Sequence, residues 1–127
     1  MATVNTVEGW LTTPDSHKLY TKSWNAVSAK ARVAYIHGFS DHCNFYDTLF
    51  YPLAQQGITV HSFDQRGWGR SVQKPAQKGL TGPTQLVMDD ITAFLKSLPK
   101  DDEHLPLFLM GHSMGCLLYT SPSPRDS

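Results

Sequence analysis

Three short apolar runs, each ending at a glycine or a polar loop, most strongly constrain the fold of this chain. They cover residues 31–36, 58–63 and 105–110. A run of this length is typical of a parallel strand that is buried on both faces. Between the runs, apolar side chains recur at helical spacing over residues 44–55 and from residue 81 to about residue 98. The order strand, helix, strand, helix, strand predicts a parallel sheet with right-handed crossover connections.

Two alternating, β-leaning runs precede this pattern, at residues 3–11 and 18–24. The sequence TTPDS between them, at residues 12–16, is rich in turn-forming residues and predicts a hairpin. The predicted fold class is therefore α/β, with an antiparallel hairpin leading into a parallel sheet with crossover helices.

The ends and buried faces of the two helices can also be read from the sequence. Asn44 is a candidate N-cap of the first helix, and Gly57 is expected to stop it. The second helix is expected to open at Thr81-Gly82-Pro83. Its predicted core face follows the helical period and comprises Leu86, Val87, Ile91, Phe94, Leu95 and Leu98.

Composition excludes several classes of function. Eleven acidic and eleven basic residues balance, and the basic residues form no stripe of the kind that a nucleic-acid interface needs. No apolar run approaches the roughly 20 residues that span a bilayer, and the polar N-terminus does not resemble a secretory signal. The only cysteines are Cys43 and Cys116, which gives no disulfide framework and is compatible with a reducing cytosol.

The segment Gly111-His112-Ser113-Met114-Gly115 follows the third apolar run and fits the pattern G-x-S-x-G. A serine on a sharp strand-to-helix turn needs neighbours without bulk, and Gly111 and Gly115 meet this demand, with His112 as a further support of the turn. Such a turn presents the hydroxyl of Ser113 at the carboxyl end of the strand, where α/β proteins bind ligands. An ordinary Gly-Ser turn also explains an isolated match, but the preceding buried strand favours a nucleophile.

A second segment, HGFSDH at residues 37–42, follows the first apolar run. Gly38 would let the backbone approach a substrate carbonyl closely. We expect His37 to orient this loop by hydrogen bonding and not to act as a general base; a histidine that merely closes a turn is the alternative.

A third segment, DQRGWGRS at residues 64–71, follows the second apolar run. Gly67 and Gly69 let it turn sharply, and an ion pair between Asp64 and Arg66 is expected to pin it. We interpret this loop as scaffold that shapes the floor of the site, in preference to a direct catalytic role.

These three segments, in this order and spacing, resemble the α/β-hydrolases, and more narrowly the fungal-type monoglyceride lipases. The opening EGWLTT at residues 8–13 and the KLY stretch at residues 18–20 match the same pattern. The resemblance runs from about residue 7 to residue 115. It implies that Ser113 is the nucleophile and that the backbone N–H groups of Phe39 and Met114 form the oxyanion hole.

The resemblance implies an acyl transfer on a small lipid ester through an acyl-enzyme, without a metal or organic cofactor. A lysophospholipase or a serine peptidase of the same fold is the alternative, and a non-catalytic truncated product is another. A cap, where present, would make peripheral contact with a membrane, so the expected location is the cytoplasm or the surface of a membrane or lipid droplet.

The catalytic triad is incomplete in these 127 residues. In this fold an acid and then a histidine follow the nucleophile, whereas here only Asp126 follows Ser113 and all six histidines precede it. The prolines and serines of residues 116–127 cannot build the helix that should follow, and the segment CLLYTSPSPRD looks like a translated sequencing-library adaptor. We therefore expect residues 1–115 to be the N-terminal portion of a domain and residues 116–127 to be a non-native, disordered tail. A genuine splice variant is the alternative.

Overall fold

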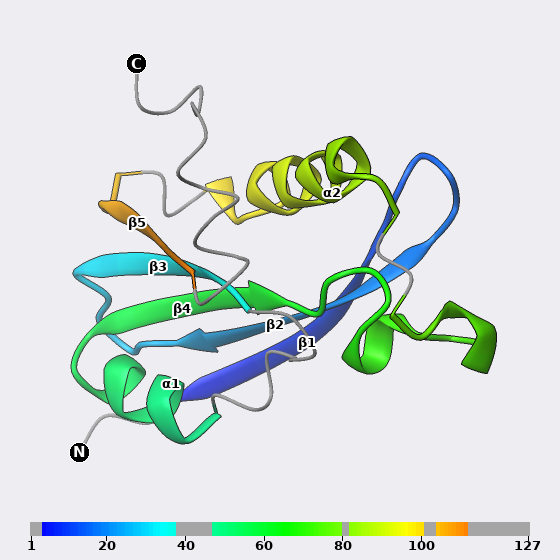
Figure 1. Cartoon of the computed structure of the whole chain (residues 1–127). Helices are drawn as coiled ribbons and strands as arrows, with labels where there is room; N and C mark the ends of the chain where they lie inside the picture. Colours follow the sequence, from blue (N-terminus) through cyan, green and yellow to red (C-terminus); the bar gives the residue numbers. More distant parts are fainter. Residues whose placement is uncertain (1–3, 38–46, 80–81, 101–103, 112–127) are drawn as a thin grey trace.

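A five-stranded mixed sheet forms the centre of the computed structural model, which describes residues 4–37, 47–79, 82–100 and 104–111 (Figure 1). The strands lie in the order β1-β2-β4-β3-β5. The hairpin β1–β2 and the pair β2–β4 are antiparallel, whereas β4–β3 and β3–β5 are parallel. Their bounds are β1 Asn5–Thr12, β2 Lys18–Asn25, β3 Ala31–Ile36, β4 Ile58–Phe63 and β5 Leu107–Gly111.

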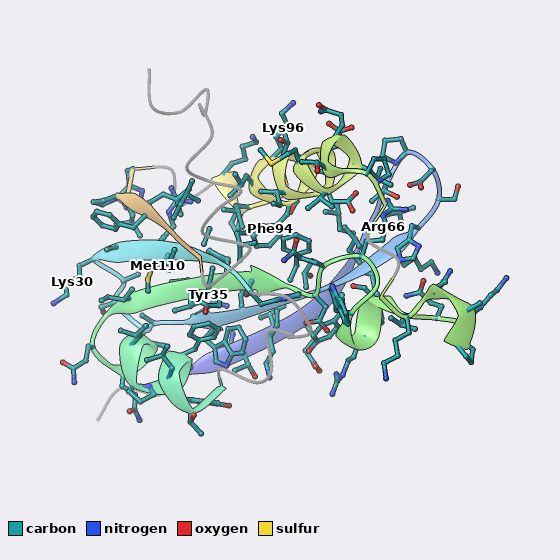
Figure 2. The ribbon with its side chains drawn as sticks, viewed as in Figure 1. Lys30, Tyr35, Arg66, Phe94, Lys96 and Met110 are labelled. Atoms are coloured by element: carbon teal, nitrogen blue, oxygen red, sulfur yellow. The ribbon has the colours of Figure 1, made fainter. Side chains whose placement is uncertain are left out.

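The two α-helices of the described residues cover opposite faces of this sheet (Figure 1). Helix α1 (Asp47–Gln55) packs on one face through Phe50 and Ala54, against a cluster that includes Trp24 of β2. Helix α2 (Thr84–Lys96) packs on the other face, toward which Phe94 points (Figure 2). Burial of a side chain such as Phe50 or Phe94 contributes about 1.5–3 kcal/mol to the free energy of unfolding.

Alternation along the strands supplies both layers of the core. In β3, Val33 and Tyr35 belong to the cluster under α1, and Ala34 and Ile36 belong to the cluster under α2. The apolar run of β3 is therefore continuous because both of its faces are buried, as the sequence predicted.

The predicted α/β fold is confirmed, with shifts at the ends of some elements. Strands β3 and β4 have the predicted bounds, and Gly57, at φ +91°, ends α1 in the left-handed conformation that glycine favours. Helix α2 begins at Thr84, after Pro83, and ends at Lys96. The candidate cap Asn44 lies outside the described residues.

The third apolar run differs from the prediction of a buried strand. Strand β5 has β3 as its only neighbour among the described strands, and Phe108 and Met110 are 57% and 43% exposed. Both side chains lie on the α1 face, beside Val33 and Tyr35 of β3, where α1 does not reach. The prediction of burial was wrong for this face because it needs a further covering element that the described residues do not supply.

Two short 3-10 turns follow β4 in the connection to α2. They are Gly69–Ser71 and Pro75–Gln77. Within the part of the chain that the structure describes, no helix is long and apolar enough to cross a bilayer.

Candidate active site

The carboxyl ends of three parallel strands meet at one edge of the sheet. Ile36 at the end of β3 is in register with Phe63 at the end of β4 and with Gly111 at the end of β5. The three segments singled out by the sequence therefore begin at strand ends that lie side by side. This edge is where open α/β sheets bind their ligands.

Several predicted site residues lie outside the described residues, so their roles remain predictions. Gly111 ends β5 and is the last residue that the structure describes, and His37 is the last described residue before the undescribed stretch 38–46. The predicted nucleophile follows Gly111 by two positions in the chain, and the predicted oxyanion loop follows His37 directly. The undescribed site residues are Gly38, Phe39, His112, Ser113, Met114 and Gly115.

His37 is fully buried and accepts two hydrogen bonds from Gln65, the second residue after β4. The backbone N–H of Gln65 donates to Nε2 of His37 at 2.8 Å, and the side-chain amide of Gln65 donates to the His37 carbonyl at 2.7 Å. A ring nitrogen that accepts from an amide N–H carries no proton, so this nitrogen is not a donor. The hydrogen bonds expected of an orienting His37 are present, and its effect on the oxyanion loop remains a prediction.

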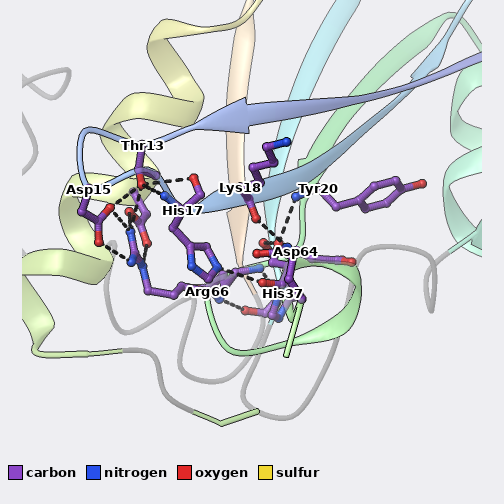
Figure 3. Close-up of polar contacts among 12 residues, drawn as sticks. Thr13, Asp15, His17, Lys18, Tyr20, His37, Asp64 and Arg66 are labelled. Atoms are coloured by element: carbon purple, nitrogen blue, oxygen red, sulfur yellow. Dashed lines mark hydrogen bonds and ion pairs between the residues drawn. The ribbon is translucent and has the colours of Figure 1, made fainter. Parts of the chain in front are cut away.

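Arg66 makes a different ion pair from the one that the sequence suggested. Its guanidinium binds both oxygens of Asp90 in α2, at 3.0 and 3.1 Å, and both oxygens of Asp15 in the hairpin turn, at 2.6 and 3.0 Å (Figure 3). The expected pair with Asp64 was therefore wrong. The two residues are close in sequence, but Arg66 turns toward the hairpin and α2, and Asp64 accepts from the backbone N–H of Arg70 at 2.8 Å instead.

These hydrogen bonds shift the pKa values of Asp15 and Arg66. Hydrogen bonding from Arg66, followed by that from Thr13, holds the pKa of Asp15 well below its ordinary value of 3.8. The hydrogen bonds that Arg66 donates, to Asp15 first and then to Asp90, raise the pKa of Arg66 above its usual range. Asp15 and Arg66 therefore stay ionised at neutral pH.

The remainder of the 64–71 loop is tied to β2. The hydroxyl of Ser71 donates to the carbonyl of Asp64 at 2.5 Å and accepts from the backbone N–H of Tyr20 at 2.9 Å. Gly67 and Gly69 adopt φ values of +90° and +52°, which L side chains rarely adopt. These contacts suit a loop that is held by the fold, as the scaffold interpretation requires.

Sequence reasoning missed Gln65, Asp15 and Asp90 as members of this region. Asp90 carried a usable signal, since it lies on the predicted apolar face of α2, between Val87 and Phe94. A carboxylate on such a face requires a buried partner. Asp15 and Gln65 carried no comparable signal, because polar residues in turns and loops are ordinary.

A cavity of about 370 Å³ lies between the hairpin turn and α2. Thr13, Pro14, Leu86, Ala93 and Lys96 are among its lining residues. Asp15 and Asp90, which bind Arg66, also line it. None of the site residues predicted from the sequence does, so we do not assign this cavity to the candidate site. The described residues contain no cluster of three or more metal-ligating side chains.

Comparison with known proteins agrees with this geometry. The sequence model of the family Hydrolase_4, described as serine aminopeptidase, S33, matches residues 27–125. A Schizosaccharomyces pombe protein provisionally named a monoglyceride lipase is 47% identical over 100 residues, which cover 76% of this chain and 26% of that protein. The mouse monoglyceride lipase is 29% identical over 106 residues, covering 83% of this chain and 34% of the mouse protein.

A solved structure shows the same arrangement. A soluble variant of monoglyceride lipase from Saccharomyces cerevisiae, in complex with a substrate analog, superposes with a TM-score of 0.77 at 28% identity. The match covers 89% of this chain and 37% of the yeast structure. The chain thus spans about a quarter to a third of the length of the curated relatives cited. The family match and the strand order together show that the chain belongs to the α/β-hydrolases, in the family described as serine aminopeptidase, S33.

Proposed function

We propose that this sequence is the amino-terminal part of a serine ester hydrolase that cleaves monoacylglycerol-like lipids. Residues 1–115 would belong to the hydrolase domain, and residues 116–127 would be a non-native tail. We call the protein encoded by the complete native reading frame the parent chain. The remaining residues of the parent chain would supply the acid and the histidine that complete the triad with Ser113.

The observation that carries this proposal is the shared register of Ile36, Phe63 and Gly111. Because these strand ends lie side by side, the serine two residues after Gly111 and the loop after His37 start from the same edge. A nucleophile and an oxyanion hole must converge on one carbonyl, and this edge supports that requirement.

The chemistry proposed for the parent chain has two steps. The downstream histidine takes the proton of Ser113 as the hydroxyl oxygen attacks the ester carbonyl, and the backbone N–H groups of Phe39 and Met114 stabilise the oxyanion. The histidine then gives its proton to the departing glycerol oxygen. Water then attacks the acyl-enzyme in the same way: the histidine takes its proton and returns it to the oxygen of Ser113 as the fatty acid is released. The proposal requires no cofactor.

The substrate class rests on the relatives. The fission yeast, mouse and budding yeast proteins carry monoglyceride lipase names. A monoacylglycerol resides in membranes and lipid droplets, so we also propose that the parent chain makes peripheral contact with such surfaces. The 127-residue chain, without the later triad members, is proposed to be inactive.

The first experiment is to sequence the source transcript through codon 115 and beyond. A frame that continues with glycine to a downstream acid and histidine supports the proposal, and a frame that ends at Ser127 contradicts it. The parent chain is then purified and treated with a fluorophosphonate. We expect one label per chain on Ser113 and none in Ser113→Ala. Hydrolysis of monoacylglycerols should also be lost in that variant, and an unlabelled parent chain would contradict a serine hydrolase.

A second candidate follows from the description of the matching family as a serine aminopeptidase. A peptidase or a lysophospholipase would use the same nucleophile. A panel of monoacylglycerols, lysophospholipids and amino-acid amides, compared by kcat/KM, separates them. We expect the monoacylglycerols to be preferred, and a preference for the amides would replace the lipase proposal with the peptidase.

A further inference from the structure

Gln65 joins the end of β4 to the end of β3 at the edge where the candidate site begins. Its side-chain amide donates to the carbonyl oxygen of His37 at 2.7 Å, and its backbone N–H donates to the ring of the same residue at 2.8 Å. Both residues are buried, with 4% of Gln65 and none of His37 exposed. One residue thus fixes the ring and the carbonyl of His37 together.

The neighbours of Gln65 hold it firmly on both sides. The backbone N–H of Asp64 donates to the carbonyl of Tyr20 in β2 at 2.8 Å. On the other side, Arg66 is held by paired hydrogen bonds to Asp90 of α2. The residues on both sides of Gln65 are therefore anchored, to β2 and to α2, whereas its own amide reaches the carbonyl of His37, just after β3. A group held from several elements is suited to positioning a neighbour within the few tenths of an ångström that catalysis requires.

The carbonyl of His37 belongs to the peptide group that leads into Gly38. Because a peptide group is planar, a hydrogen bond that fixes this carbonyl also fixes the plane from which the following loop departs. The proposed oxyanion donor Phe39 is two residues beyond His37. We infer that Gln65 is a positioning residue for the oxyanion loop, an inference that rests on the function proposed above.

The expected effect lies in the transition state and not in substrate binding. Removing an oxyanion donor outright costs about 10²–10³-fold in kcat. Gln65 only aligns such a donor, so its loss should lower kcat by a smaller factor, on the order of 10-fold, with KM changed by less than about 3-fold. A residue that served stability alone would reduce the number of working sites without altering each site.

The test uses the parent chain and the variant Gln65→Met, which keeps length and volume but removes the side-chain donor. Gln65→Asn is measured alongside, because its amide is one methylene too short to reach the carbonyl. The matched control is Gln73→Met. Gln73 also donates its amide to a backbone carbonyl, that of Lys18 at 3.1 Å, but it is exposed and does not contact His37.

Three quantities are measured for each variant: working sites by fluorophosphonate titration, kcat and KM per titrated site on a monoacylglycerol, and the inhibition constant of a trifluoromethyl ketone. The ketone forms a tetrahedral oxyanion with the nucleophile, so its affinity reports the oxyanion hole. We expect Gln65→Met and Gln65→Asn to lower kcat per site about 10-fold and to weaken the ketone by a similar factor. Gln73→Met should leave both unchanged.

The inference is overturned if Gln65 variants lose titratable sites while the remaining sites keep the kcat and ketone affinity of the parent, or if neither quantity changes. Failure of the proposed function looks different. In that case the unaltered parent chain is not labelled at Ser113, and the inference fails with it.

Discussion

Replacing Arg66 with methionine should destabilise the protein more than any other change of a single charged side chain among the described residues. The guanidinium binds four carboxylate oxygens, two of Asp90 and two of Asp15, and joins the loop after β4 to α2 and to the hairpin turn. Methionine fills a similar volume without charge. The variant therefore isolates the electrostatic contribution of the cluster.

The magnitude follows from the burial of each partner. The Asp90 side chain is 5% exposed, and removing the cation of a buried ion pair costs about 3–5 kcal/mol because an uncompensated charge remains. The Asp15 side chain is 53% exposed, so solvent screens it and its share is about 0–1 kcal/mol. We expect Arg66→Met to cost about 3–5 kcal/mol in total, a large part of a typical margin of about 5–15 kcal/mol.

This cost is measured by urea unfolding of the parent chain and its variants, monitored by circular dichroism. A double-mutant cycle with Asp90→Leu identifies its cause, since the double variant should be more stable than Arg66→Met alone. Arg70→Met is the control, because its pair with Glu8 is exposed on both sides and should contribute far less to stability than the Arg66 pairs. The reasoning is refuted if Arg66→Met costs no more than this control, or if the two substitutions at positions 66 and 90 are simply additive.

Three further predictions follow. Because folding lowers the pKa of Asp15, its pair with Arg66 contributes its full stability above the unfolded-state pKa of about 4, and this contribution is lost as the pH falls toward the lower folded-state pKa. The unfolding free energies of the wild type and Asp15→Asn should therefore converge in acid, and a constant difference would argue against the pair. Phe94→Ala should cost about 3–5 kcal/mol by urea unfolding because its ring is buried between α2 and the sheet, whereas Phe108→Ala should cost less than about 1 kcal/mol, and equal costs would contradict the two environments. The 127-residue chain should self-associate through β5, so replacing Phe108 and Met110 with lysine should lower its aggregated fraction in sedimentation; an unchanged fraction would locate the association elsewhere.

The sequence predicted those parts of the fold whose signal is local and periodic. Strand β3 shows why: Val33 to Ile36 alternate between the two core layers, so every position is apolar and the run is visible without knowing its neighbours. The stop of α1 at Gly57 was equally local, because a left-handed residue after a final turn favours glycine.

The parts that sequence could not predict depend on which distant groups meet. Arg66 had Asp64 as the nearest acid in the sequence, yet its partners lie 51 and 24 residues away, in elements whose relative placement follows from packing alone. The hydrogen bonds between Gln65 and His37, 28 residues apart, depend in the same way on the parallel register of β3 and β4.

The exposed side of β5 shows a limit of a different kind. An apolar run records the burial that a strand has in its complete surroundings, so Phe108 and Met110 carry information about an element that the described residues do not contain. Leu107 and Leu109, on the other face, pack against the α2 cluster and show that the strand itself is correctly placed. The mismatch on one face alone therefore indicates that the cover of this face lies outside the described ranges, and not that the strand is misplaced.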